Sequence, residues 1–125
     1  MSVKEITDMS KKGELRRMSL IEPVCPPKHT NTDAYALVNP ETVGAKNIAF
    51  FCVEIHPGGA AEEDTHPNIE HGYFLISGKG LAKVEGEEFN MEPGDCLWIP
   101  PGARHEIKPI GDETIRFAVF SSPPR

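Results

Sequence analysis

From about Tyr35 onward, the chain alternates between short apolar stretches and strong turn signals. The apolar stretches are rich in Val, Ile, Phe, Tyr and Trp, which are the residue types that favour β-strands. They predict strands at residues 47–56, 70–77, 81–85, 89–91, 95–99, 105–108 and 114–121. The turn signals that separate them are Pro57-Gly58-Gly59, Gly78-Lys79-Gly80, Glu85-Gly86-Glu87, Pro93-Gly94-Asp95, Pro100-Pro101-Gly102 and Gly111-Asp112. Short strands at intervals of about ten residues are typical of a β-sandwich or a small barrel.

The first part of the chain lacks this alternation. Residues 1–18 carry only a weak apolar stripe and predict a short helix or a loose arm. Residues 22–28 contain three prolines and predict an extended connector, which we expect to cross a surface or to reach a partner subunit. The sequence therefore predicts an N-terminal arm and connector over residues 1–34 and a single β-barrel domain over residues 35–125.

The composition supports an all-β chain. Among its 125 residues are 11 Gly and 12 Pro, well above the ~12% that average usage would give, and these residues suit turns rather than long helices. Apolar residues make up 38% of the chain and occur in ordered runs, which argues against disorder. Its three cysteines are widely spaced and lack a CxxC pair, which fits reduced thiols in a cytosol.

The charge balance argues against several classes of partner. Lys and Arg number 13 and Asp and Glu number 19, so the formal net charge is −6 and phosphate backbones are repelled. No apolar run approaches the ~20 residues that cross a bilayer, and charged residues fill the region of a signal peptide's apolar core. We therefore expect a cytoplasmic protein that binds neither nucleic acid nor membranes.

Candidate chemistry is concentrated in three of the five histidines, which share a spacing pattern with Asp64. Asp64 and His66 are two residues apart, so in an extended segment their side chains point the same way. His71 and His105 lie at the starts of two predicted strands. If the strands close into a barrel, these four side chains can converge inside one mouth.

Such a set of ligands suits a divalent metal ion. Neutral imidazole nitrogens with one carboxylate bind Mn, Fe, Co, Ni or Zn, and the lack of sulfur ligands argues against structural zinc. Glu70 is a rival carboxylate. In an extended strand it points away from His71, but a bulge before His71 would let it replace Asp64. We predict one divalent ion per chain, held by His66, His71, His105 and Asp64. The alternative is that Asp64 is an ordinary loop acid and that water completes the shell of three His ligands.

The spacing also resembles the two motifs of the cupin superfamily, G-x5-H-x-H-x3,4-E-x6-G and G-x5-P-x-G-x2-H-x3-N. The matching residues are Gly58, Asp64, His66, His71 and Gly78 in the first half, and Gly94, Pro100, Gly102 and His105 in the second. Asp64 stands where the first His is usual, His71 where Glu is usual, and Pro109 where Asn is usual. The resemblance implies a small antiparallel jelly-roll barrel, or double-stranded β-helix, with one metal ion inside.

Within that superfamily, the run over residues 70–80 resembles the ureidoglycine aminohydrolase type. There too an acidic residue precedes the His pair, and a His followed by Gly stands in the Glu position. Those enzymes carry two cupin domains in one chain, use Glu where this chain has Asp64, and place Gln where it has His105. The gap between the His residues is also one residue longer in this chain. The resemblance implies a manganese-type, redox-neutral site and leaves the substrate open.

Two further side chains are candidates for moving protons. Tyr73 shares the inward face of its predicted strand with His71 and can act as a general acid or base. Glu54 lies in a strand whose two faces are apolar apart from Glu54 itself and the terminal His56, so its charge requires a partner.

The sequence leads to three hypotheses about function. The first is a redox-neutral metalloenzyme, whether hydrolase, lyase or isomerase, that acts on a small polar metabolite. The second is an iron-dependent dioxygenase, and the third is a binding module without catalysis. The resemblance also suggests a homodimer formed through the N-terminal arm or an outer sheet face.

Overall fold

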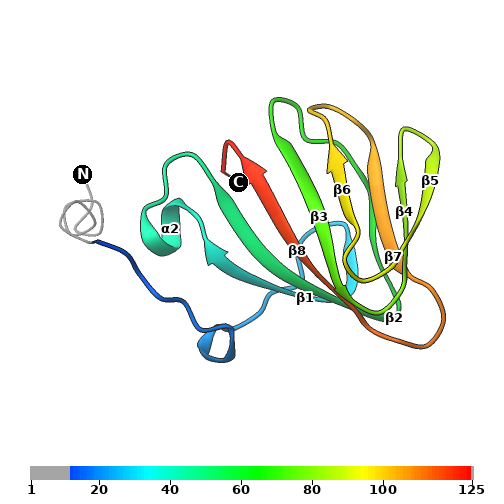
Figure 1. The fold of residues 1–125 in the computed structure, drawn as a ribbon, viewed down its shortest axis with the longest axis horizontal. Coiled ribbons are helices and arrows are strands. Elements are labelled where there is room, and N and C mark those ends of the chain that lie inside the picture. The colour runs from blue at the N-terminus through cyan, green and yellow to red at the C-terminus, as the bar shows by residue number, and fades with distance from the viewer. Residues whose placement is uncertain (1–11, 125) are drawn as a thin grey trace.

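The computed structural model describes residues 12–124, and its regular structure is almost entirely β-strand (Figure 1). The strands are β1 (His29–Val38), β2 (Ala49–Asp64), β3 (Glu70–Ser77), β4 (Gly80–Val84), β5 (Glu87–Met91), β6 (Cys96–Ile99), β7 (His105–Pro109) and β8 (Ile115–Ser122). Two single-turn helices, η1 (Met18–Leu20) and α2 (Pro40–Val43), flank β1. Among these residues no helix has the length and hydropathy needed to cross a bilayer. The predicted all-β class is confirmed.

The strands form one antiparallel sheet that curls on itself, as Figure 1 shows. The strand order is β5-β4-β7-β2-β8-β3-β6, and β1 pairs with β2 outside this path. The long strand β2 belongs to both halves of the curl. Its first part, up to Ile55, pairs with β8, and its last part, from Ala61 to Asp64, pairs with β7. This arrangement is the jelly roll that the motif resemblance implied.

The predicted turn at Pro57-Gly58-Gly59 is wrong, because β2 continues through it. The register with β1 jumps between Ile55 and Ala60, so residues 56–59 lie opposite Asn31 alone. Gly58 adopts a φ of 85°, and the Asn31 side-chain amide donates to the Pro57 carbonyl at 3.1 Å. A bulge of this kind bends a strand without ending it, and here it leads β2 from one half of the sheet into the other.

The first strand begins earlier than the sequence pattern indicated. β1 starts at His29, so the expected boundary between residues 34 and 35 falls inside a strand. The Pro-rich connector joins the sheet as well, because Val24 exchanges two backbone hydrogen bonds with Ala34, of 3.0 and 2.8 Å. The predicted helix or loose arm covers residues 1–18, and residues 1–11 of it lie outside the part of the chain that the structure describes.

The core lies between the two halves of the curl. Its fully buried members come from both sides and include Ile55, Leu75, Ile99, Ile107, Ile115 and Phe117. Burial of one such side chain stabilises a fold by about 1.5 to 3 kcal/mol. This layer holds together the strands that carry the candidate functional residues.

Candidate metal centre

Three histidines from separate segments meet inside the curl. His66 lies in the connection between β2 and β3, His71 is the second residue of β3, and His105 is the first residue of β7. The backbone N–H of Gly102 donates to the His66 carbonyl at 3.1 Å. Because Gly102 belongs to the turn that leads into β7, this bond holds the His66 segment beside His105.

The nitrogen donors of these histidines converge. One ligand atom from each lies within 4.8 Å of the other two, and the Nε2 atoms of His71 and His105 are 3.2 Å apart. His105 Nδ1 donates to the Ala103 carbonyl at 3.0 Å, which leaves the Nε2 lone pair directed at the cluster. Metal–nitrogen bonds of about 2.0–2.1 Å place neighbouring ligands about 3 Å apart. The three histidines could therefore hold a metal ion.

Asp64 lies beside this cluster but is not part of it. Its Oδ2 is 3.8 Å from His66 Nε2, while its Oδ1 accepts hydrogen bonds from Lys28 Nζ at 3.2 Å and from the Thr65 N–H at 2.8 Å. Partial burial raises the pKa of Asp64, but the Thr65 and Lys28 bonds and the nearby His66 outweigh it, so the pKa lies below its usual value. The predicted fourth ligand is thus an ionised carboxylate already paired with Lys28.

The other two acidic candidates lie on the outer face of the sheet. Glu70 Oε2 accepts a hydrogen bond of 2.7 Å from Trp98 Nε1 and is directed away from the histidines. Glu54 alternates with the core residue Val53 along β2, and its Oε2 accepts bonds from Nε and Nη2 of Arg116, of 3.0 and 2.6 Å. Glu54 therefore does not reach the cavity. The partner that its charge requires is Arg116 on the neighbouring strand.

A cavity of about 290 Å³ opens beside the histidines. Tyr73 is buried in its wall, with its ring edge-on to His71 and His105 at centroid distances of 5.9 and 6.5 Å. Most of the remaining wall is apolar, and its residues include Ala34, Phe51, Val53, Ala61, Phe117 and Val119. Tyr73 therefore lines the same cavity as His66 and His105.

One wall of this cavity could not be expected from the motif spacing. Val24, Pro26 and Pro27 of the connector line it, together with His29 at the start of β1. His29 pairs with the core residue Ala61 across the strands, so the two side chains share the inward face. Its Nδ1 lies 2.8 Å from the Pro27 carbonyl. No motif spacing links His29 to the other histidines. Its place in the cavity wall follows only from the position of the connector in the folded chain.

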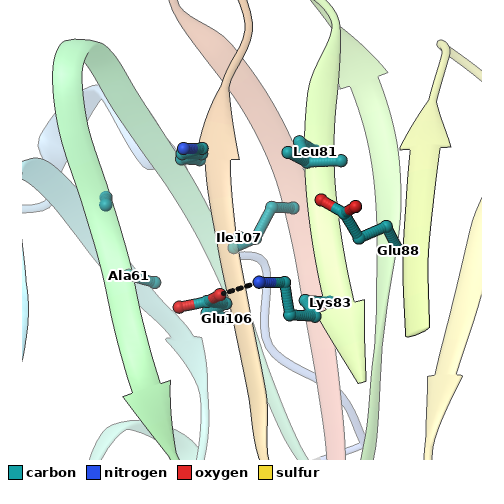
Figure 2. Close-up of a pocket in the computed structure, with 8 residues that line it drawn as sticks. Ala61, Leu81, Lys83, Glu88, Glu106 and Ile107 are labelled. Carbon is teal, nitrogen blue, oxygen red and sulfur yellow. Dashed lines mark ion pairs between the residues drawn. The ribbon is translucent and has the colours of Figure 1, made fainter. Parts of the chain in front are cut away.

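A second, smaller hollow of about 100 Å³ lies over β2, β7 and β4 (Figure 2). Lys83 and Glu106 form an ion pair of 3.4 Å there, and the other lining side chains include Leu81, Glu88 and Lys108. Glu106 and Lys108 alternate with the inward-facing His105 and Ile107 along β7. This hollow therefore lies on the outer surface and is separate from the histidine cluster.

Fold and site together define a class of protein, namely small jelly-roll β-proteins with an internal cluster of histidines that could hold a metal ion. A family model described as "Cupin domain" matches residues 51–121, which is more than half of the chain. The chain belongs to the cupin family.

Relatives within this family have diverse names. The tetracenomycin polyketide synthase protein TcmJ of Streptomyces glaucescens is 31% identical over 100 residues, covering 80% of this chain and 67% of that protein. The (S)-ureidoglycine aminohydrolase of Escherichia coli is 32% identical over 77 residues, covering 62% of this chain and 29% of that enzyme. A crystal structure of a predicted oxalate decarboxylase from Thermotoga maritima superposes with a TM-score of 0.78 at 19% identity, covering 87% and 98% of the two chains. The structural likeness supports the fold alone.

Proposed function

We propose that this chain is a metal-dependent enzyme that acts on a small molecule without oxidising or reducing it. The observation that carries this proposal is the convergence of three histidine donors, two of which, His66 and His105, line a cavity of about 290 Å³. His66, His71 and His105 would hold the ion, and Asp64 is the candidate fourth ligand once its carboxylate turns from Lys28. A divalent ion bound there supplies Lewis-acid chemistry to a substrate oxygen. Manganese is our first choice of metal, because of the similarity to the aminohydrolase type.

The lining of the cavity favours a different class of substrate from the small polar metabolite expected from the sequence. Its walls are mainly aliphatic and aromatic, so they favour a molecule with an apolar body and an oxygen-bearing head rather than a uniformly polar metabolite. Its volume lies near the lower end of the range for ligand pockets. The similarity to a polyketide synthase protein supports an apolar body of this kind.

We assign proton transfer in the cavity to Tyr73 and His29, in place of Glu54. Both side chains line the same cavity as His66 and His105. The Pro27 carbonyl can only accept a hydrogen bond, so the 2.8 Å contact fixes the proton of neutral His29 on Nδ1. His29 Nε2 is then the ring nitrogen with a lone pair, as a general base requires.

This assignment predicts the tautomer of His29. In long-range ¹H–¹⁵N correlation spectra of the metal-free protein above pH 8, His29 is expected to carry its proton on Nδ1. Assignment of the signals rests on the loss of one ring system in His29→Gln. A neutral His29 with its proton on Nε2 would mean that the bond to Pro27 does not hold the ring and that Nε2 is no base.

The proposed function is tested with a probe that combines an aromatic ring and two oxygen donors, 2-hydroxybenzoate. We expect it to bind the manganese-loaded protein at least about tenfold more tightly than the metal-free protein, measured by calorimetry. Malate, which has similar donors and no apolar body, should bind more weakly. Val119→Phe narrows the cavity and should retain the metal while losing the probe. Equal binding of 2-hydroxybenzoate with and without metal would contradict the proposal.

Turnover separates the proposal from its two alternatives. Aromatic β-keto acids are incubated with the manganese-loaded protein without oxygen, and the products are followed by mass spectrometry. A product formed without oxygen supports the redox-neutral enzyme. Turnover only with iron, with ¹⁸O₂ incorporated into the product, would instead identify an iron-dependent dioxygenase. Metal-dependent binding without turnover under either condition would identify a binding module and overturn the proposed enzyme.

A further inference from the structure

The wall of the larger cavity carries a buried hydroxyl group, that of Ser121 on β8. This residue is 5% exposed and lines the cavity of about 290 Å³. β8 lies between β2 and β3 in the sheet, as Figure 1 shows, so its inward side chains form the middle of the wall. Val119 and Phe117, the preceding inward residues of β8, are apolar. Ser121 is therefore a polar position in a wall that is otherwise apolar along this strand.

No contact within residues 12–124 explains this hydroxyl. The Ser121 Oγ makes no hydrogen bond in that part of the chain, whereas the Oγ of the neighbouring Ser122 donates to the Asn47 carbonyl at 2.6 Å. A buried hydroxyl that loses its bonds with water and gains no other destabilises the folded state. The partner of Ser121 must therefore come from the cavity, as water in the free protein or as an oxygen of a bound molecule.

The strand register places Ser121 beside the candidate metal centre. Ser121 pairs with His71 of β3 on one side and with Ala49 of β2 on the other. Residues directly opposite each other share a face of the sheet, with Cβ atoms about 4.5 to 5.5 Å apart. Ser121 is therefore the immediate neighbour of one of the three histidines that could hold an ion. A molecule with one oxygen directed at those histidines brings its next oxygen to Ser121.

Further along β8 the same wall becomes apolar. Val119 pairs with Phe51 and Tyr73, Phe117 pairs with Val53, and all five residues line the cavity. The lining thus changes from a hydroxyl beside the histidines to aromatic and aliphatic side chains within one strand. This order favours one orientation of a ligand, with its oxygen-bearing head at Ser121 and its apolar body over Val119 and Phe117.

We propose that Ser121 is a specificity-determining residue that donates a hydrogen bond to the head of the substrate. This inference rests on the proposed function, in which a metal ion binds another oxygen of the same head. The substrate class is thereby narrowed to apolar molecules whose head carries two neighbouring oxygens, such as a carboxylate or a β-dicarbonyl group. A head with a single oxygen leaves either the ion or Ser121 without a partner, and a buried polar group left unpaired discriminates strongly against such a ligand.

Three variants test this assignment by titration calorimetry with 2-hydroxybenzoate and the manganese-incubated protein. Ser121→Ala should weaken binding about tenfold or more, the effect of losing a hydrogen bond to a charged group, and should leave the manganese content unchanged. Ser121→Thr keeps the hydroxyl and should restore most of the affinity. Ser122→Ala is the matched control, because Ser122 is adjacent in the chain and its hydroxyl bonds Asn47 instead of lining the cavity. It should bind the probe as the parent protein does.

The failure of this inference is distinguishable from the failure of the proposed function. Equal binding by the parent protein with and without manganese concerns the ion, whereas the comparison of parent with Ser121→Ala concerns the hydroxyl. A Ser121→Ala protein with the affinity of the parent would overturn the inference, as would a parent protein that does not bind the probe. An equal loss in Ser121→Thr would also overturn it, because the hydroxyl is then not the group that binds. Loss of manganese from Ser121→Ala would show that Ser121 acts through the ion, which contradicts a direct bond to the substrate.

Discussion

Replacing His105 by alanine is expected to abolish metal binding while the fold is retained. His105 contributes one of three converging donors, and its Nε2 lies 3.2 Å from that of His71. Mutations of groups that only orient a ligand already cost 10- to 100-fold in metal affinity, so loss of a ligand itself should cost more than about 100-fold. The measurement is metal content by elemental analysis, after equilibrium dialysis against manganese.

His56→Ala is the matched control for His105→Ala. His56 bonds Asp33 through Nε2 at 2.9 Å and Thr114 through Nδ1 at 3.0 Å, and it is not part of the metal-binding group. This variant should keep the metal content of the parent protein. A His105→Ala protein that is folded by circular dichroism and still binds manganese fully would show that other residues hold the ion.

The second large effect is expected for Gly78→Ala, in the two-residue connection between β3 and β4. Gly78 has a φ of 83°, and a Cβ there would lie 2.5 Å from the Thr114 carbonyl oxygen. Backbone must therefore move, and the free energy of unfolding should fall by about 3 kcal/mol or more. Urea denaturation provides the measurement.

Gly94→Ala isolates the contribution of backbone conformation alone. Gly94 has a φ of 95°, but nothing lies within 4 Å of its would-be Cβ. Its substitution should cost about 1 kcal/mol, from strain without a clash. Equal losses for the two variants would contradict the close approach at Gly78.

Strands were well predicted where short-range pattern decides the structure. Six of the seven expected strands lie within two residues of the observed ends, because turn signals bound each of them. The predicted strand over residues 47–56 ends too early, because β2 continues to Asp64. The bend at Gly58 depends on pairing with β1, and the local sequence gives no sign of that pairing. β1 itself was missed because its first half is polar, from His29 to Asp33.

In the candidate site too, features set by motif spacing were predicted, and features set by long-range contacts were not. Motif spacing was sufficient to place His66, His71 and His105 together, because the barrel fixes where their segments meet. The spacing could not reveal that Lys28 binds the Asp64 carboxylate, or that Arg116 balances Glu54 on the outer face. Those contacts join residues 36 and 62 positions apart, which no local pattern specifies.

The most direct test of this account is an anomalous-difference map from crystals of the manganese-loaded protein. We expect one peak per chain, about 2.0 to 2.3 Å from the Nε2 atoms of His71 and His105 and from a ring nitrogen of His66. The map will also show whether Asp64 leaves Lys28 to become the fourth ligand. No peak at these histidines, or a peak held by other residues, would contradict the metal centre on which the proposed function depends.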